Sequence, residues 1–68
     1  MGMTKQEALT AMEEGKKVTH SYFGQYEYMY LENNKYKFED GIIVLPERFW
    51  KLRQGEGWEK GWRLWDGN

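Results

Sequence analysis

Aromatic rings and positive charges alternate from Phe49 to Trp65, and this stretch offers the clearest chemistry in the sequence. It holds all four tryptophans of the chain, with lysines and arginines between them. A flat ring beside a cation can bind a planar, anionic ligand, because the ring stacks on the ligand and the cation pairs with its charge. Alternatively, a very small domain uses tryptophans for its core, since each ring buries a large area. The sequence leaves both interpretations open.

The residue types needed for catalysis are scarce. The chain has no cysteine and one histidine, His20, so it offers neither a thiolate nucleophile nor a His/Cys metal cluster. Ser21 follows His20 in a predicted strand, where neighbouring side chains point to opposite faces and do not form a nucleophile–base pair. GxSxG and phosphate-cradling glycine motifs are missing too. We therefore expect a protein that is not an enzyme, without catalytic residues, metal or cofactor.

Length and charge narrow the class of protein. At 68 residues the chain is one domain, 1–68, near the lower limit for an unaided core. Its net charge of −1 gives no electrostatic footprint for duplex nucleic acid. No apolar run reaches the ~18 residues of a membrane span, and the polar start is not typical of a secretory signal, so we expect a cytoplasmic protein. The aromatic content of 18% is the expected substitute for disulfide or metal staples, and a dimer or larger assembly that buries rings between subunits would be another.

A helix is predicted from Thr4 to Glu14. Thr4 and Glu7 have the spacing of a capping box, in which each side chain accepts a hydrogen bond from the other residue's backbone amide. Gly15 suits the left-handed position that ends a helix. A helix of about three turns is not stable alone, so we expect it to dock on a sheet.

A strand from Val18 to Phe23 and a hairpin are predicted next. The hairpin pairs Tyr26–Leu31 with Lys35–Asp40 through a turn at Asn33 and Asn34, because asparagine tolerates positive φ. This turn sets a register in which one face of the ribbon is apolar and packs under the helix: Met29, Leu31, Tyr36 and Phe38. The other face interleaves tyrosines with charged residues: Tyr26, Tyr28, Tyr30, Lys35, Lys37 and Glu39.

The tyrosine face has two interpretations. Contiguous exposed aromatics often mark a surface that binds a partner or ligand, which is the interpretation we favour. Cross-strand packing of tyrosine rings against lysine stems is the alternative.

The remaining elements complete an α+β fold. Ile42–Leu45 is predicted as a buried strand, and Pro46 suits the first position of a short helix over Glu47–Leu52. Gln54–Gly57 is predicted as a loop, and Gly61–Trp65 as a closing strand with Arg63 and Trp65 on one face. The expected fold is a small antiparallel sheet, with an N-terminal helix packed on it and a second short helix before the last strand.

The candidate ligand-binding residues are rings and cations: Lys17, His20, Tyr22, Phe23, Tyr28, Trp50, Arg53, Trp58, Trp62 and Arg63. A histidine within a strand more often has a structural, hydrogen-bonded role, which is the alternative for His20. For Arg53 and Arg63 the alternative to phosphate binding is surface salt bridging.

The order of these signals resembles a family of small phage proteins, the Thoeris anti-defence sponges of the second type. The resemblance is carried by a short helix with Glu7–Ala8–Leu9, by Gly15–Lys16–Lys17–Val18 entering a strand, and by Tyr22–Phe23–Gly24. A tryptophan-bearing end, 61–65, is similar as well. The family usually has Gly-Trp where this chain has Ser21–Tyr22–Phe23, and its middle section is longer, so the clearest similarity covers the first third.

The resemblance implies a homo-oligomer that sequesters a cyclic nucleotide immune signal without cleaving it, in the cytoplasm of an infected bacterial cell. It also implies a pocket between subunits that uses aromatic and basic side chains. A rival hypothesis is a protein–protein inhibitor that blocks a host defence protein directly, because tyrosine, tryptophan and arginine are enriched at interface hot spots. A structural or regulatory module of a phage assembly is the third possibility.

Overall fold

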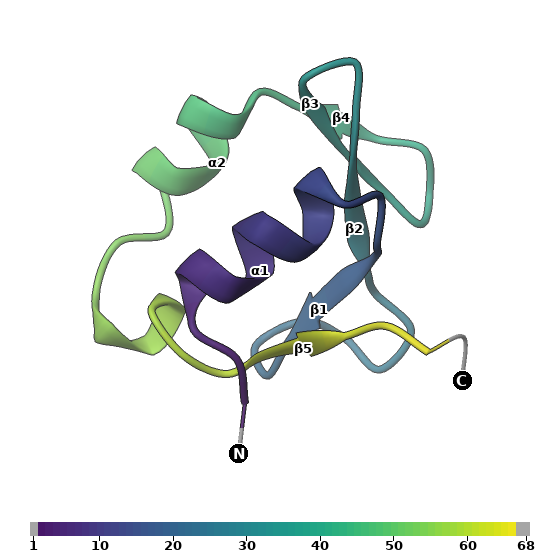
Figure 1. The fold of residues 1–68 in the computed structure, drawn as a ribbon. Coiled ribbons are helices and arrows are strands. Elements are labelled where there is room, and N and C mark those ends of the chain that lie inside the picture. Colours follow the sequence, from purple (N-terminus) through teal and green to yellow (C-terminus); the bar gives the residue numbers. More distant parts are fainter. Residues whose placement is uncertain (1, 67–68) are drawn as a thin grey trace.

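The computed structural model describes residues 2–66, which form one sheet with two α-helices on one side (Figure 1). The sheet is five-stranded and antiparallel, in the order β4-β3-β2-β1-β5. The elements are α1 Lys5–Glu13, β1 Val18–His20, β2 Met29–Glu32, β3 Lys35–Phe38, β4 Ile43–Val44, α2 Pro46–Lys51, the 3₁₀ helix η1 Glu56–Trp58 and β5 Trp62–Leu64. This is the expected α+β fold.

Both ends of α1 follow the local signals of the sequence. The Thr4 hydroxyl accepts a hydrogen bond from the Glu7 amide at 3.1 Å, and the Glu7 carboxylate accepts one from the Thr4 amide at 2.8 Å. Gly15 has φ +88°, a conformation that a residue with a Cβ adopts only at a cost. The predicted capping box and helix end are confirmed.

The hairpin register is also confirmed. Asn33 and Asn34 have φ 54° and 63°, as a two-residue I′ turn requires. Leu31 then pairs with Tyr36, and Met29 pairs with Phe38. This pairing directs Met29, Tyr36 and Phe38 toward the core and leaves Tyr30 on the opposite face of the sheet.

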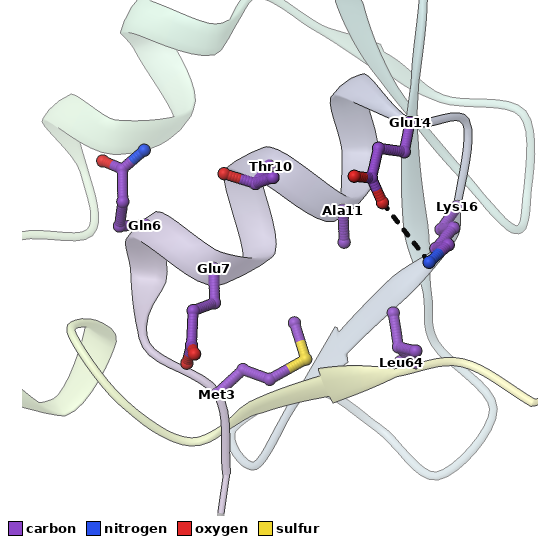
Figure 2. A pocket seen from close by; sticks show the side chains of 8 residues that line it. All are labelled: Met3, Gln6, Glu7, Thr10, Ala11, Glu14, Lys16 and Leu64. Atoms are coloured by element: carbon purple, nitrogen blue, oxygen red, sulfur yellow. Dashed lines mark ion pairs between the residues drawn. The ribbon is translucent and has the colours of Figure 1, made fainter.

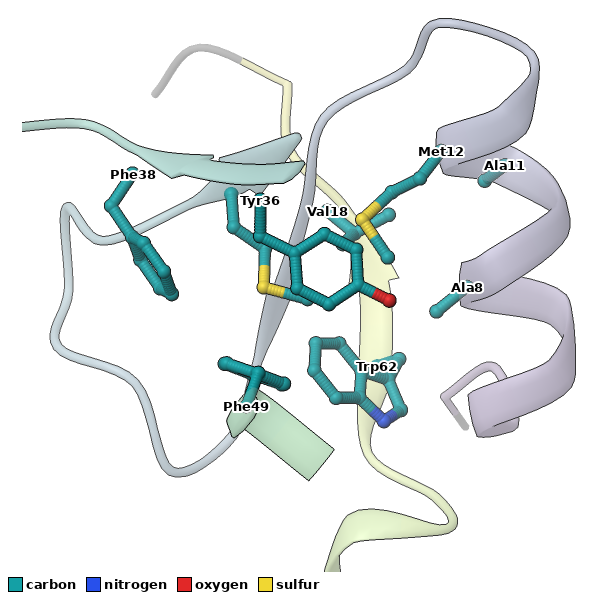
Figure 3. Packing of buried hydrophobic residues seen from close by; sticks show 9 residues of the cluster. Ala8, Ala11, Met12, Val18, Tyr36, Phe38, Phe49 and Trp62 are labelled. Carbon is teal, nitrogen blue, oxygen red and sulfur yellow. The ribbon is translucent and has the colours of Figure 1, made fainter. Parts of the chain in front are cut away.

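The core lies between the helices and the inner face of the sheet (Figure 3). Its buried members are Ala8, Ala11, Met12, Val18, Met29, Tyr36, Phe38, Phe49 and Trp62. Two indole N–H groups are satisfied inside it. Trp62 Nε1 donates to the Trp58 carbonyl at 2.8 Å, and Trp50 Nε1 donates to the Tyr36 hydroxyl at 2.8 Å.

Several local predictions need correction. β1 ends at His20 rather than Phe23, because the chain turns there and the Phe23 amide bonds back to the His20 carbonyl at 2.9 Å. Ile42 and Ile43 are 58% and 57% exposed, so the predicted buried strand is an exposed edge strand in which Val44 faces the core. The predicted loop 54–57 contains the start of η1.

β2 begins at Met29, so Tyr26 lies outside it in the preceding turn. None of the helices described in 2–66 has the length and apolar character needed to cross a membrane.

Candidate functional site

The outer face of the sheet, opposite the helices, gathers rings and cations from four strands. Tyr30 pairs with Lys37, and the register of Val18 with Met29 places Lys17 beside Tyr30. The Trp65 amide bonds to the Lys17 carbonyl at 2.9 Å, which places Trp65 next along the row. With Tyr28 and Arg63 from the adjacent row, we call this surface the ring–cation face: Lys17, Tyr28, Tyr30, Lys37, Arg63 and Trp65.

Ring contacts hold this face together. Tyr28 lies 5.1 Å from Trp65 and 6.3 Å from Tyr30, measured between ring centroids. The Lys17 ammonium lies 4.9 Å and 5.6 Å from the Tyr28 and Tyr30 centroids, within the range of a cation–π contact. Both tyrosines and Trp65 are half-buried, and Lys17 and Arg63 are exposed. The rings are therefore fixed by packing while the cations reach solvent.

The charge of the outer face differs from that of the whole chain. By strand alternation this face carries four basic residues, Lys17, Lys35, Lys37 and Arg63, and two acidic ones, Glu32 and Glu39. Lys37 forms an ion pair with Glu32 at 3.7 Å. The face is thus locally positive in a chain of net charge −1. It suits an anionic ligand.

A shallow hollow opens beside the ring–cation face. It measures about 280 Å³ and is lined by Gly15, Lys16, Lys17, Leu64 and Trp65. Lysine and indole side chains again border the same space. The hollow gives a ligand stacked near Trp65 a second surface to contact.

His20, Tyr22, Phe23, Trp58 and Trp62 are also brought together, but on the inner side. His20 Nε2 donates to the Gly57 and Lys60 carbonyls at 2.9 Å and 2.6 Å, and Nδ1 accepts from the Tyr22 amide at 2.9 Å. Its ring centroid lies 4.4 Å from that of Trp58 and 4.7 Å from that of Trp62. Since Trp62 is 0% exposed and both nitrogens of the buried His20 are engaged, this cluster joins η1 to the sheet.

Arg53 and Trp50 lie apart from the ring–cation face. The Arg53 guanidinium lies 4.1 Å from the Phe49 ring centroid and donates to the Phe49 carbonyl at 3.4 Å. Arg53 also borders a hollow of about 200 Å³ whose lining includes the carboxylates of Glu27, Glu39 and Asp40, which oppose an anion. The Trp50 ring is half-buried, with the Lys5 ammonium 4.3 Å from its centroid.

A further hollow, between α1 and β5, is less suited to an anion (Figure 2). It measures about 300 Å³, with Met3, Ala11 and Leu64 as its apolar lining and with polar residues around them: Gln6, Glu7, Thr10, Glu14 and Lys16. Lys16 pairs with Glu14 at 3.3 Å, so the basic side chain is already matched by an acidic one. None of the candidate residues from the sequence lines this hollow.

Among the ten candidates, the structure places Lys17, Tyr28 and Arg63 together on the ring–cation face. Tyr30 and Trp65 were not among them, although both belong to this face. Their signal was strand alternation, which puts Tyr30 on the face of Tyr28 and Trp65 on that of Arg63.

Comparisons of the chain with known family models, curated proteins and solved structures give no significant match. The resemblance to the anti-defence sponges therefore stays a prediction.

Proposed function

We propose that this protein binds and sequesters a cyclic nucleotide immune signal without cleaving it, as a phage anti-defence protein in the cytoplasm of the infected bacterial cell. The single observation that carries the proposal is the ring–cation face. Half-buried rings and exposed cations share an open, positive surface there. The base stacks on the rings, and its phosphate pairs with nearby cations.

The position of each residue on the ring–cation face determines its proposed role in binding. Trp65 and Tyr28 supply the stacking surface, because their rings already pack against each other and need little ordering on binding. Lys17 and Arg63 neutralise the phosphate. Catalytic residues are not part of the proposal, and a sponge requires only tight binding with slow release.

The test is to incubate purified protein with a mixed panel of cyclic nucleotides and cyclic ADP-ribose isomers. Free ligand is filtered away, the protein is denatured, and the released molecules are identified by mass. Recovery of one intact nucleotide supports the proposal and names the ligand. A cleaved product, or the release of no nucleotide from micromolar protein, contradicts it.

Variants locate the site. Lys17→Ala and Arg63→Ala each remove one charge-assisted contact, so each is expected to weaken ligand binding about tenfold or more. Arg53→Ala is the matched control, because it removes a cation from outside the ring–cation face. Equal losses from all three variants would contradict this location.

The second candidate function is direct inhibition of a host defence protein. It is favoured by the exposed apolar side chains of Ile42, Ile43 and Leu45 at the β4 edge. Such an edge can pair with a strand of a partner. An inhibitor is expected to retain no nucleotide and to capture a host protein whose recovery falls with Ile43→Lys at this edge.

A homo-oligomer is part of the leading proposal. A second copy would cover apolar surface that one chain leaves exposed, and the β4 edge is the strongest candidate for that contact.

A further inference from the structure

We propose that the ring–cation face also binds short single-stranded nucleic acid, engaging two or three consecutive nucleotides with little preference for sequence. This inference rests on the same surface as the proposed function, but its ligand is an oligonucleotide, which is longer than a cyclic nucleotide. It starts from the extent of the face.

The face is wider than one nucleotide. The row Lys37–Tyr30–Lys17–Trp65 crosses four neighbouring segments, which are β3, β2, the residue before β1 and the residue after β5. Adjacent strands are about 4.8 Å apart, so the row extends over roughly 14 Å. Open sheet faces with aromatic side chains stack two or three bases in this way when they bind single strands.

The order of side chains along the row suits a strand of nucleotides, in which bases and phosphates alternate. Cation, ring, cation and ring alternate along the row, and the Lys17 ammonium contacts the ring of Tyr30 in the row and that of Tyr28 in the adjacent row. Arg63 adds a cation in the next row, opposite Thr19. A base that stacks on Tyr30 therefore has Lys37 and Lys17 on either side for its phosphates, and a base that stacks on Trp65 has Lys17 beside it.

The same features separate a single strand from a duplex. Rings can stack only on bases that are not already stacked and paired, and the net charge of −1 gives the chain no wide basic surface for a duplex. Sequence preference should be weak. Stacking tolerates every base, and the charged groups of this face are cations suited to phosphates.

The test measures binding of thymidine monophosphate, of oligothymidylates from the dimer to the octamer, of a duplex of the same octamer and of cyclic AMP to the intact protein by calorimetry. Affinity is expected to rise about tenfold for each added nucleotide up to the second or third, because each added base stacks on a further ring. The logarithm of affinity should fall with the logarithm of salt concentration with a slope of about −0.7 for each phosphate contacted.

Two variants test the location. Trp65→Leu and Tyr30→Leu should each weaken binding of the octamer about tenfold by removing one stacking ring. The controls are Tyr22→Leu, an exposed ring on the inner side, and Lys51→Ala, an exposed cation on α2. Both controls should bind like the wild type, and circular dichroism verifies that every variant is folded.

The outcomes separate this inference from the proposed function. Cyclic nucleotide binding, with oligomers no tighter than the monophosphate, overturns this inference and leaves the proposed function standing. Length-dependent binding of oligomers without retention of any cyclic nucleotide supports the inference against the proposed function. Failure of both ligand classes overturns both, and a duplex that binds as tightly as the single strand overturns the inference alone.

Discussion

At the scale of residues, His20 is held in one tautomer by its surroundings. Because Nε2 faces two carbonyls and Nδ1 faces an amide, the proton must be on Nε2. His20→Ala leaves these groups without their partner and opens a cavity among rings. The free energy of unfolding should fall by about 2–4 kcal/mol in a urea titration.

Ligand binding by the folded fraction of His20→Ala is the control for this prediction. A structural histidine predicts unchanged affinity once the unfolded fraction is taken into account. Unchanged stability with lost affinity would instead make His20 a ligand contact, as the sequence allowed.

The buried Tyr36 predicts that the free energy of unfolding depends on pH. Burial raises the pKa of Tyr36 above its ordinary value of 10.0, opposed by the hydrogen bond from Trp50 and assisted by the charge of Glu13. Between the unfolded and folded pKa values only the folded state holds the proton, so the unfolded state is favoured as pH rises. The free energy of unfolding should therefore be flat with respect to this group below pH 10 and should fall above it, by at most about 1.4 kcal/mol per pH unit.

The comparison variant is Tyr36→Phe, followed by urea titrations across the same pH range. It should start less stable, because the buried Trp50 N–H loses its acceptor, but it should lack the Tyr36 part of the decline. An identical decline in both proteins would assign it to other groups.

At the scale of elements, the α1 cap makes a measurable contribution to stability. Thr4→Ala removes the acceptor for the Glu7 amide and should lower the free energy of unfolding by about 1 kcal/mol. In a domain of this size that corresponds to a fall in Tm of about 4–8 °C. Thr10→Ala is the matched control, since Thr10 is an exposed residue inside α1 and alanine is the better helix former. Equal destabilisation by both variants would contradict the capping role.

Elements with local signals could be predicted from the sequence. The Thr4–Glu7 box set the start of α1, and Asn33–Asn34 set the hairpin and its register. β4 could not be predicted as an exposed edge strand, because the same run of apolar residues is compatible with an edge strand and with a buried one. Its place depends on the order of the sheet, which no local pattern records.

At the scale of the whole molecule, the candidate site was only partly predictable. The tryptophan-rich stretch divides between the two sides of the sheet, with Trp62 in the core and Trp65 on the outer face. Lys17 joins Trp65 only through pairing of β1 with β5, far apart in the sequence. Ring and cation types therefore indicated the chemistry, while the long-range register decided which of them meet.

The β4 edge predicts how copies of the chain assemble. The Phe38 amide bonds to the Ile42 carbonyl at 2.9 Å, so the alternation of an antiparallel ladder turns the Ile43 backbone toward the free edge. Two copies related by a two-fold axis can pair these edges and bury Ile43, which is 57% exposed. Sedimentation should show a dimer or larger assembly for the wild type, and Ile43→Lys should shift it to the monomer.

Leu52→Lys is the matched control for the edge. Leu52 is 81% exposed and follows α2, so the variant places the same charge on an apolar position outside β4. It should leave the assembly intact. A wild type that stays monomeric at all concentrations, or equal dissociation of both variants, would contradict assembly through β4. Because the outer face lies on the same sheet, loss of nucleotide binding together with assembly in Ile43→Lys would place the ligand at the subunit contact, whereas retained binding would assign it to one chain.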